Sequence, residues 1–162
     1  MLHTVALNAS HARKLFNCEE PSLENYLRKQ AGQDVKRQVA ACFILEGEEN
    51  SIKGYYTLSA DSLDRTLIPE SLRNKLPYKN LPVTLLGRLA RDINYKGQGV
   101  GELLLADALI RAYQASTSIG AWAVVTDPIN EKARAFYESF GFISLESGRM
   151  FIPMATIRAS FI

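Results

Sequence analysis

The sequence contains little of what metal-binding, disulfide-stabilised and membrane-spanning proteins need. It has only 2 cysteines, Cys18 and Cys42, and only 2 histidines, His3 and His11, among its 162 residues. The cysteines form no Cys-x-x-Cys pair, so no zinc site is predicted and both thiols are expected to be reduced. No uncharged apolar run approaches the roughly 18–20 residues of a membrane span, and no basic segment followed by an apolar one indicates an export signal. These absences predict a cytoplasmic protein with no metal and no membrane association.

Internal repeats, low-complexity tracts and linker-like stretches rich in Gly, Ser or Pro are also missing. With 47% hydrophobic and 22% charged residues, the composition is that of an ordinary globular protein. A chain of this length is within the usual size of one domain. We therefore expect residues 1–162 to form a single domain.

The net charge of the chain is small but unevenly distributed. The 19 Lys and Arg residues against 17 Asp and Glu residues give +2, which by itself predicts no polyanionic partner. Residues 51–100, however, hold 8 basic and 4 acidic residues, whereas the segments before and after them each carry −1. The middle of the chain therefore carries the whole positive excess.

Hydrophobic periodicity predicts a mixture of helices and strands. We expect helices from about Ser22, from Pro69, from the glycines near residue 100 to about Ser116, and over 130–140, and strands over 39–46, 52–60, 83–90, 121–126, 142–145 and 150–154. The long helix ending near Ser116 has a polar stripe of Asp107, Arg111 and Gln114. The pattern predicts an α/β (α+β) protein with a mixed sheet packed by helices. The apolar tail Met154–Ile162 is expected to be either a dimer contact or a core strand.

The turn before the long helix is rich in glycine. It reads Lys96-Gly97-Gln98-Gly99-Val100-Gly101. Glycines let several backbone N–H groups surround one point, and the helix N-terminus adds unpaired donors and the positive end of its dipole. The pattern predicts a phosphate-binding turn, although its spacing is neither that of dinucleotide-binding folds nor that of a Walker loop. A glycine-rich turn without a ligand is the alternative.

The segment from Asn130 to Phe142 carries a second pattern. It places Ala133, Phe136 and Tyr137 on one helix face, with Asn130 near the helix N-terminus. Taken alone, the pattern is explained by an ordinary helix in which the tyrosine is a core residue and the asparagine is the N-cap. Together with the glycine turn, it resembles the Gcn5-related N-acetyltransferase (GNAT) superfamily, whose signatures are [Arg/Gln]-x-x-Gly-x-Gly/Ala and Asn-x-x-Ala-x-x-[Phe/Leu]-Tyr-x-x-x-Gly-Phe.

The GNAT resemblance implies a fold and a cofactor. The fold is a mixed twisted β-sheet of about six strands flanked by helices, with splayed central strands forming the acetyl-CoA cleft. Backbone groups of the strand before the glycine turn would pair with the pantetheine arm, the turn amides would hold the pyrophosphate, and the asparagine would bind pantetheine. The residues that match these roles are Leu89, Arg91, Lys96, Gly97, Gln98, Gly99, Val100, Gly101, Asn130 and Phe136. Lys96 stands where the family prefers Arg or Gln.

The first half of the chain carries a narrower resemblance. The segments 16–27, 33–34, 54–60 and 82–90 look like those of the GNAT toxins of bacterial toxin–antitoxin modules, and the similarity extends from about Ser10 to Met154. Those toxins acetylate the α-amino group of aminoacyl-tRNA, which blocks translation. The resemblance implies a ribbon–helix–helix antitoxin and a homodimer.

Acyl transfer from a thioester needs a neutral amine, an oxyanion donor and a proton for the departing thiolate. A lysine amine has a pKa of about 10.4, whereas a peptide α-amine, at about 7.7–8.0, is already partly neutral at physiological pH. We find no acidic residue at an obvious base position, which suits such a substrate. Tyr137 is the candidate general acid, and the backbone amide near Leu89 is the candidate oxyanion donor.

Basic residues on both sides of the predicted cleft form a candidate tRNA surface. They are Lys36, Arg37, Arg73, Lys75 and Arg88. Each of them could equally be an ordinary solvated charge. Two alternatives therefore stay open, namely a GNAT enzyme acting on a protein N-terminus, a lysine or a small amine, and a module that binds a ligand without turnover.

Overall fold

The computed structural model describes residues 2–73 and 75–162. The chain packs as two compact units. The first comprises Met1–Ser59 and Gly87–Arg111, and the second comprises Ala60–Leu86 and Ala112–Ile162. Neither unit is continuous in sequence, because two long strands and one long helix each contribute residues to both units.

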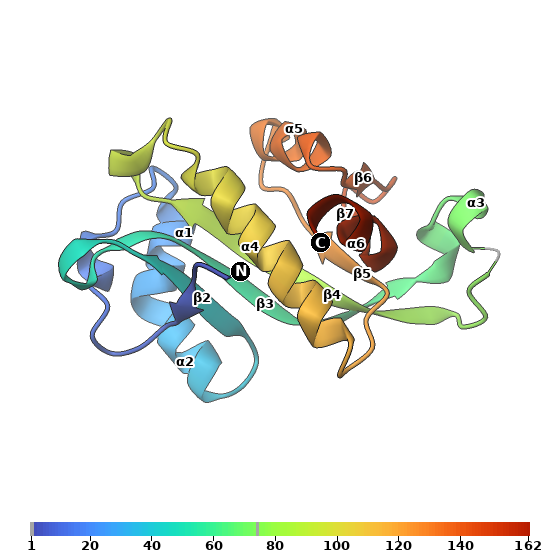
Figure 1. The fold of residues 1–162 in the computed structure, drawn as a ribbon, viewed down its shortest axis with the longest axis horizontal. Helices are drawn as coiled ribbons and strands as arrows, with labels where there is room; N and C mark the ends of the chain where they lie inside the picture. The colour runs from blue at the N-terminus through green and yellow to red at the C-terminus, as the bar shows by residue number, and fades with distance from the viewer. Residues whose placement is uncertain (1, 74) are drawn as a thin grey trace. The chain divides into compact units, whose positions relative to one another are not determined.

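The helices and strands follow the order that hydrophobic periodicity predicts (Figure 1). The strands are β1 (Val5–Ala6), β2 (Ala41–Glu46), β3 (Ile52–Asp64), β4 (Asn80–Arg91), β5 (Ala123–Thr126), β6 (Ile143–Ser144) and β7 (Met150–Pro153). The α-helices are α1 (Pro21–Asn25), α2 (Ala31–Lys36), α3 (Glu70–Arg73), α4 (Val100–Ser116), α5 (Glu131–Ser139) and α6 (Met154–Phe161). Residues Tyr26–Gln30 form a π-helical turn between α1 and α2.

The strands form a seven-stranded mixed sheet in the order β1-β2-β3-β4-β5-β7-β6. Strands β4 and β5 are parallel, whereas the β1–β2, β2–β3, β5–β7 and β6–β7 pairs are antiparallel. This arrangement confirms the predicted mixed sheet flanked by helices. The structure has one strand more than the expected number of about six. The additional strand, β1, has only two residues, which is too few for an alternation of apolar and polar residues to be recognised in the sequence.

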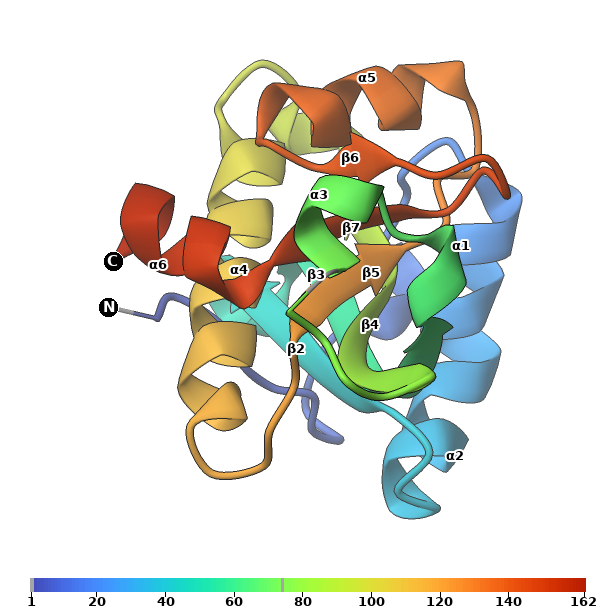
Figure 2. The ribbon, with the colours of Figure 1, turned by 90° about the vertical axis from the view of Figure 1, so that its right-hand side faces the viewer.

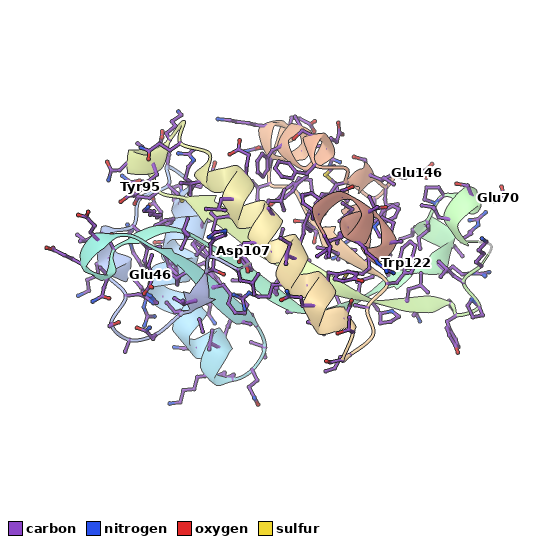
Figure 3. The ribbon with its side chains drawn as sticks, viewed as in Figure 1. Glu46, Glu70, Tyr95, Asp107, Trp122 and Glu146 are labelled. Atoms are coloured by element: carbon purple, nitrogen blue, oxygen red, sulfur yellow. The ribbon has the colours of Figure 1, made fainter. Side chains whose placement is uncertain are left out.

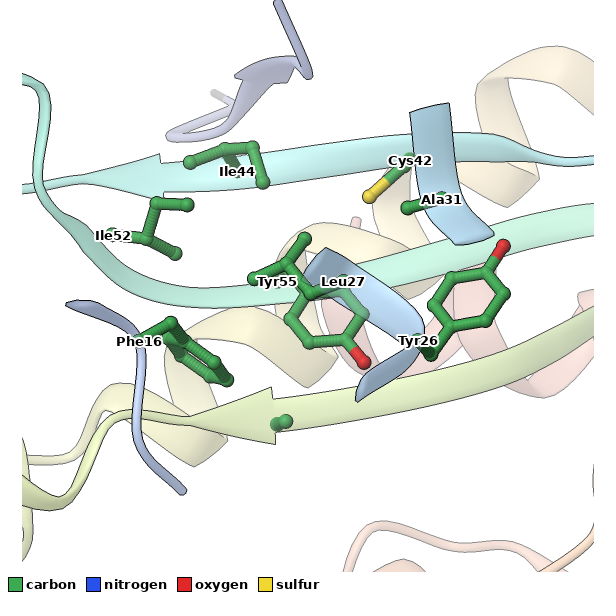
Figure 4. Packing of buried hydrophobic residues seen from close by; sticks show 9 residues of the cluster. Phe16, Tyr26, Leu27, Ala31, Cys42, Ile44, Ile52 and Tyr55 are labelled. Atoms are coloured by element: carbon green, nitrogen blue, oxygen red, sulfur yellow. The ribbon is translucent and has the colours of Figure 1, made fainter. Parts of the chain in front are cut away.

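In the first unit, helices cover both faces of β2 and β3. The α1–α2 segment lies on one face and α4 lies on the other (Figure 2). Figure 4 shows the core under the α1–α2 segment, where the Phe16 and Tyr55 rings meet edge to face at 5.6 Å. The buried apolar residues of this core are Phe16, Tyr26, Leu27, Ala31, Cys42, Ile44, Ile52, Tyr55 and Ala90. Tyr26, Leu27 and Ala31 therefore form the buried face of this segment.

The second unit has its own apolar core. It is built around β5 and β7, whose residues are all buried. The core residues are Leu63, Ile68, Leu81, Val83, Ala123, Val125, Leu145 and Phe151. Continuous apolar runs of this kind are typical of strands covered on both faces. The tail Met154–Phe161 is the helix α6, so the core-strand alternative for this segment was wrong.

Asp107, in the predicted polar stripe of α4, is a buried residue. This residue, labelled in Figure 3, is 1% exposed and does not face solvent. Its carboxylate accepts hydrogen bonds of 2.6 Å from both the Thr4 and Tyr56 hydroxyls. Arg111 donates to the same two hydroxyls, at 3.0 Å and 2.9 Å, and its guanidinium lies over the Phe43 ring. Asp107 and Arg111 thus belong to a polar network that ties the N-terminal segment to α4, whereas Gln114 is exposed.

Candidate active site

The glycine turn has a conformation that other residues rarely adopt. Gly97 and Gly99 have φ angles of +76° and +75°, in the left-handed region where a Cβ atom is disfavoured. A Cβ atom built at either position would meet no heavy atom within 4 Å. Backbone conformation therefore accounts for the glycines, and the space above them is open.

Four backbone amides of this turn are free to bind a ligand. Among residues 2–73 and 75–162, no protein acceptor pairs with the N–H groups of Gly97, Gly99, Val100 or Gly101. The first intrahelical-type bond of α4 runs from the Leu103 amide to the Gly99 carbonyl at 3.0 Å. Unpaired amides at the N-terminus of a helix are a common anion-binding site. A pyrophosphate fits this turn by charge and by the donors that the turn offers.

Asp92 anchors the segment that leads into the glycine turn. It is 4% exposed and accepts hydrogen bonds from the backbone amides of Asn94, at 2.9 Å, and Asn17, at 3.1 Å. The Asp92 amide in turn donates to the Lys53 carbonyl at 2.8 Å. These bonds fix the short 3-10 turn Ile93–Tyr95 immediately before Lys96.

Strand β4 extends beyond the residues that pair with β5. The parallel register pairs Val83, Thr84 and Leu85 of β4 with Ala123, Val124 and Val125, and it ends there. Strand β4 itself continues to Arg91, so Leu89 and Arg91 lie beyond the end of this ladder. Strands that splay apart must stop pairing before they end, and the β4–β5 ladder meets this condition.

Helix α5 carries the second predicted group of residues. Asn130 is its N-cap, and the Asn130 side-chain oxygen accepts a hydrogen bond from the Ala133 amide at 2.8 Å. Phe136 and Tyr137 are neighbours, with ring centroids 5.5 Å apart, and Tyr137 also packs against Phe142 at 5.3 Å. Tyr137 is 7% exposed. Gly141, at φ +103°, ends this helical segment as predicted.

The Tyr137 phenol is shielded from solvent. Burial raises the pKa of Tyr137, and Thr126 acts in the opposite direction. Thr126 is itself 2% exposed and donates to the Leu86 carbonyl at 2.9 Å. A buried phenol with a raised pKa remains protonated at neutral pH, which a proton donor requires.

An ionic cluster holds the segment between β5 and α5. The Arg149 guanidinium donates two hydrogen bonds of 3.0 Å to the Asp127 carboxylate and one of 3.1 Å to Asp61. Two nearby carboxylates and these hydrogen bonds raise the pKa of Arg149, against the opposing effect of burial. Asp127 directly follows Thr126, so the cluster fixes the chain at the start of the segment that leads to Asn130.

The candidate tRNA-binding cations differ in their surroundings. Lys36, Arg37 and Lys75 are exposed. Arg73 is half-buried and donates to the Thr66 carbonyl at 3.2 Å. Arg88 is also half-buried, and its guanidinium lies over the Tyr26 ring at 3.6 Å from the centroid. The three exposed side chains are thus free to meet a ligand, whereas Arg73 and Arg88 already have protein contacts.

Sequence patterns brought out only part of this site. The structure places the glycine turn, Leu89, Arg91 and Arg88 in the first unit, and Asn130, Phe136 and Tyr137 together in the second. Thr126, Asp92 and Arg149 were not predicted, since single polar residues beside apolar strands carry no spacing signal. Of these three, only Thr126 could have been noticed in the sequence, because it is a polar residue at the end of the apolar run 123–126.

Comparison with known proteins identifies the family. The profile described as "Acetyltransferase (GNAT) domain" matches residues 38–144. The chain belongs to the GNAT acetyltransferases. This confirms the resemblance inferred from the two signatures, and with it the predicted fold and enzyme class.

Several relatives of this GNAT chain are toxins. The "tRNA-acetylating toxin" of Mycobacterium tuberculosis (strain ATCC 25618 / H37Rv) is 38% identical over 127 residues, which are 78% of this chain and 75% of that protein. The structure of AtaT complexed with acetyl-methionyl-tRNAfMet has a TM-score of 0.92 and 32% identity, covering 98% of each chain. A Tyr-to-Phe mutant of the AtaT toxin, bound to the C-terminus of the antitoxin AtaR and acetyl-CoA, has a TM-score of 0.83 and 29% identity, covering 96% of this chain and 95% of that one.

Within the described ranges, no helix of this GNAT chain is both long enough and apolar enough to cross a membrane. The same residues contain no group of three or more His, Cys, Asp and Glu side chains placed to hold a metal ion.

Proposed function

We propose that this GNAT enzyme transfers the acetyl group of acetyl-CoA to the α-amino group of aminoacyl-tRNA and thereby blocks translation. The observation that carries the proposal is the likeness over 98% of the chain to AtaT complexed with acetyl-methionyl-tRNAfMet. The 38% identity to a tRNA-acetylating toxin supports it independently. The amino acid that the enzyme prefers depends on loops for which no sequence motif exists.

The first unit would hold acetyl-CoA through its backbone. The free amides of Gly97, Gly99, Val100 and Gly101 would bind the pyrophosphate, with Lys96 and Gln98 at the rim of the turn. The stretch of β4 beyond its ladder with β5, at Leu89 and Arg91, would pair with the pantetheine arm, and the amide near Leu89 would donate to the oxyanion. Acetyl-CoA supplies the activated acetyl group, and these residues orient it.

The second unit would provide the proton. Within the part of the chain that the structure describes, no acceptor pairs with the side-chain N–H groups of Asn130, whose oxygen caps α5, so Asn130 can donate to pantetheine. Phe136 and Tyr137 would line the thiol end. Tyr137 would protonate the departing thiolate as general acid, which the raised pKa of its phenol supports. A substrate amine of low pKa loses its own proton without a dedicated base.

Exposed cations would contact the tRNA backbone. Lys36, Arg37 and Lys75 are the residues free to do so, while Arg88 and Arg73 would present guanidinium groups already held in place by Tyr26 and Thr66. Such phosphate contacts add affinity without base specificity.

The partners and the place of action follow from this function. AtaT in complex with the AtaR C-terminus supports an antitoxin partner for this chain, which we expect to be a ribbon–helix–helix protein. We also propose that residues 1–162 act as one functional domain, as a homodimer, in the bacterial cytoplasm where charged tRNA is used. Light scattering would give twice the chain mass, and a result at the chain mass would reject the dimer.

The deciding experiment uses radiolabelled acetyl-CoA and total charged tRNA, with deacylated tRNA as the control. Label is expected in N-acetylated amino acids released from tRNA by mild base. Label in protein or in small amines, with none in RNA, would select the alternative GNAT substrate class instead. Tyr137→Phe should lower kcat by about 10²–10⁴-fold, and an unchanged rate would remove Tyr137 from the mechanism.

A further inference from the structure

Two arginines of the second unit meet at the turn between β6 and β7. Arg134 of α5 donates to the Ser144 hydroxyl and to the Gly148 carbonyl, both at 2.8 Å. Arg149, which ends the same turn, donates two bonds of 3.0 Å to the Asp127 carboxylate. The side chains of the two arginines are only 23% and 24% exposed. The turn is therefore bonded both to helix α5 and to the residue that follows β5.

The connection from β5 to α5 starts at Asp127, ends at the N-cap Asn130 and has few contacts of its own. Pro128 has no backbone N–H, and Ile129 is 54% exposed. Within the described residues, no backbone hydrogen bond outside the helices and strands involves Asp127, Pro128 or Ile129. The bonds from Arg149 to the Asp127 carboxylate therefore hold the start of this connection, and with it the approach to Asn130.

The Arg149 ion pairs are better suited to fixing geometry than to adding stability. The side chains of Asp127 and Asp61 are 58% and 32% exposed. Ion pairs with such exposed partners contribute little to the free energy of unfolding. Two parallel bonds to Asp127, with a third of 3.1 Å to Asp61, nevertheless fix the plane of the guanidinium. Asp61 belongs to β3, so this cluster ties the connection after β5 to that strand.

Arg134 restrains the rotation of α5 about its own axis. Arg134 and Tyr137 are three residues apart in this helix, so their side chains lie on the same face. The planar guanidinium of Arg134 bonds to two separate acceptors, the Ser144 hydroxyl and the Gly148 carbonyl. A rotation of α5 would break both bonds and would move the Tyr137 phenol. The direction of the phenol therefore depends on Arg134.

We propose that Arg149 and Arg134 are positioning residues for the groups that α5 contributes to the site. Arg149 acts through Asp127 on the place of Asn130, and Arg134 acts on the direction of Tyr137. This inference rests on the roles proposed above for Asn130 in pantetheine binding and for Tyr137 as general acid. Reaction rates depend steeply on such geometry, because a reacting group displaced by about 1 Å loses up to about 10²-fold in rate.

Lysine substitutions separate the two roles, because lysine keeps the charge but has no planar fork. Arg149→Lys should raise Kd for acetyl-CoA, measured by calorimetry, about tenfold and leave kcat at saturation within about threefold of wild type. Arg134→Lys should lower kcat with charged tRNA about tenfold and leave this Kd within about threefold. Arg158→Lys, at an exposed position of α6 in the same unit, is the matched control and should change neither. Equal losses of both quantities in both variants would overturn the two roles.

Double-mutant cycles distinguish a failure of this inference from a failure of the proposed function. In an Asn130→Ala background, Arg149→Lys should raise Kd for acetyl-CoA no further, because no side-chain amide is left to position. In a Tyr137→Phe background, Arg134→Lys should lower kcat no further for the same reason. Losses that add in full would overturn the positioning roles alone. Wild-type values in both Asn130→Ala and Tyr137→Phe would reject the proposed function itself, and the positioning roles with it.

Hydrogen exchange tests the geometry without cofactor or substrate. The Ala133 amide donates to the Asn130 side chain at 2.8 Å, so its protection reports on the N-terminus of α5. This amide should exchange about tenfold faster in Arg149→Lys than in wild type, and at the wild-type rate in Arg158→Lys. Melting temperatures of all variants establish that each one is folded. An unchanged rate in Arg149→Lys would overturn the role of Arg149, whatever the acceptor of the acetyl group proves to be.

Discussion

Asp107 is a buried carboxylate whose partners hold its charge in place. Burial by itself raises the pKa of Asp107, but hydrogen bonds from Thr4, Tyr56 and the His3 amide, together with the Arg111 charge, outweigh burial and lower it. A carboxyl with a lowered pKa stabilises the folded protein above the pKa of the unfolded chain. That stabilisation is lost as the pH falls through the lower, folded-state pKa.

Asp107→Asn should therefore destabilise the protein in a pH-dependent way. At pH 7 the asparagine NH₂ group would face hydroxyl and amide donors, and we expect the free energy of unfolding to fall by about 1–3 kcal/mol. The deficit should shrink below about pH 4, where the wild-type carboxylate becomes protonated as well. Urea unfolding at pH 7 and pH 3 measures both effects.

Glu102→Gln provides the matched control for Asp107→Asn, because Glu102 is an exposed acidic residue of the same helix. Its effect on the free energy of unfolding should be within about 0.5 kcal/mol. Equal losses at pH 7 and pH 3 for Asp107→Asn would show that the carboxylate charge is not what stabilises the network.

At the scale of elements, the glycine turn links backbone conformation to ligand binding. Gly99→Ala would place a methyl group in the open space above the turn, at a φ of +75°. The left-handed backbone conformation costs an alanine about 1–2 kcal/mol, so we expect the variant to fold. We expect KM for acetyl-CoA to rise at least tenfold, with a smaller change in kcat at saturation.

Gly120→Ala is the comparison for Gly99→Ala. Gly120 also has no heavy atom within 4 Å of a built Cβ, and it has no positive φ. This change should leave KM for acetyl-CoA unaltered. Steady-state kinetics on both variants would decide the point, and equal KM values for Gly99→Ala and wild type would exclude the turn as the pyrophosphate site.

The elements also show which features a sequence reveals. The helix around Tyr137 was predictable because its apolar spacing, its N-cap Asn130 and its closing Gly141 all agree. The burial of Asp107 was not predictable, because the spacing of polar residues is the same whether they face solvent or a buried partner. The α6 segment was ambiguous because an apolar run of nine residues suits a strand or a short helix equally well. Thr126 and Asp92 act through partners distant in sequence, which no local pattern encodes.

At the scale of the whole molecule, the positive charge bears on substrate capture. The net +2 is small, but residues 51–100 hold 8 basic and 4 acidic residues. If exposed cations such as Lys75 contact phosphates, kcat/KM for charged tRNA should fall steeply with salt. Lys75→Ala should reduce the slope of log kcat/KM against log salt by about one.

Arg158 provides a comparison at an exposed position of α6 outside the proposed tRNA surface. Arg158→Ala should leave the salt slope of tRNA acetylation as it is in wild type. The KM for acetyl-CoA, measured in parallel, separates effects on the tRNA from effects on the cofactor. A slope unchanged by Lys75→Ala would remove Lys75 from the tRNA surface.

The discontinuity of the two units affects the order in which the protein can fold on the ribosome. The first unit needs residues up to Arg111, and the second needs the chain through its last helix. A nascent chain that ends at Arg111 contains the glycine turn but lacks Asn130, Phe136 and Tyr137. A nascent chain can therefore assemble the proposed cofactor-binding turn before the residues of the proposed proton donor have been made.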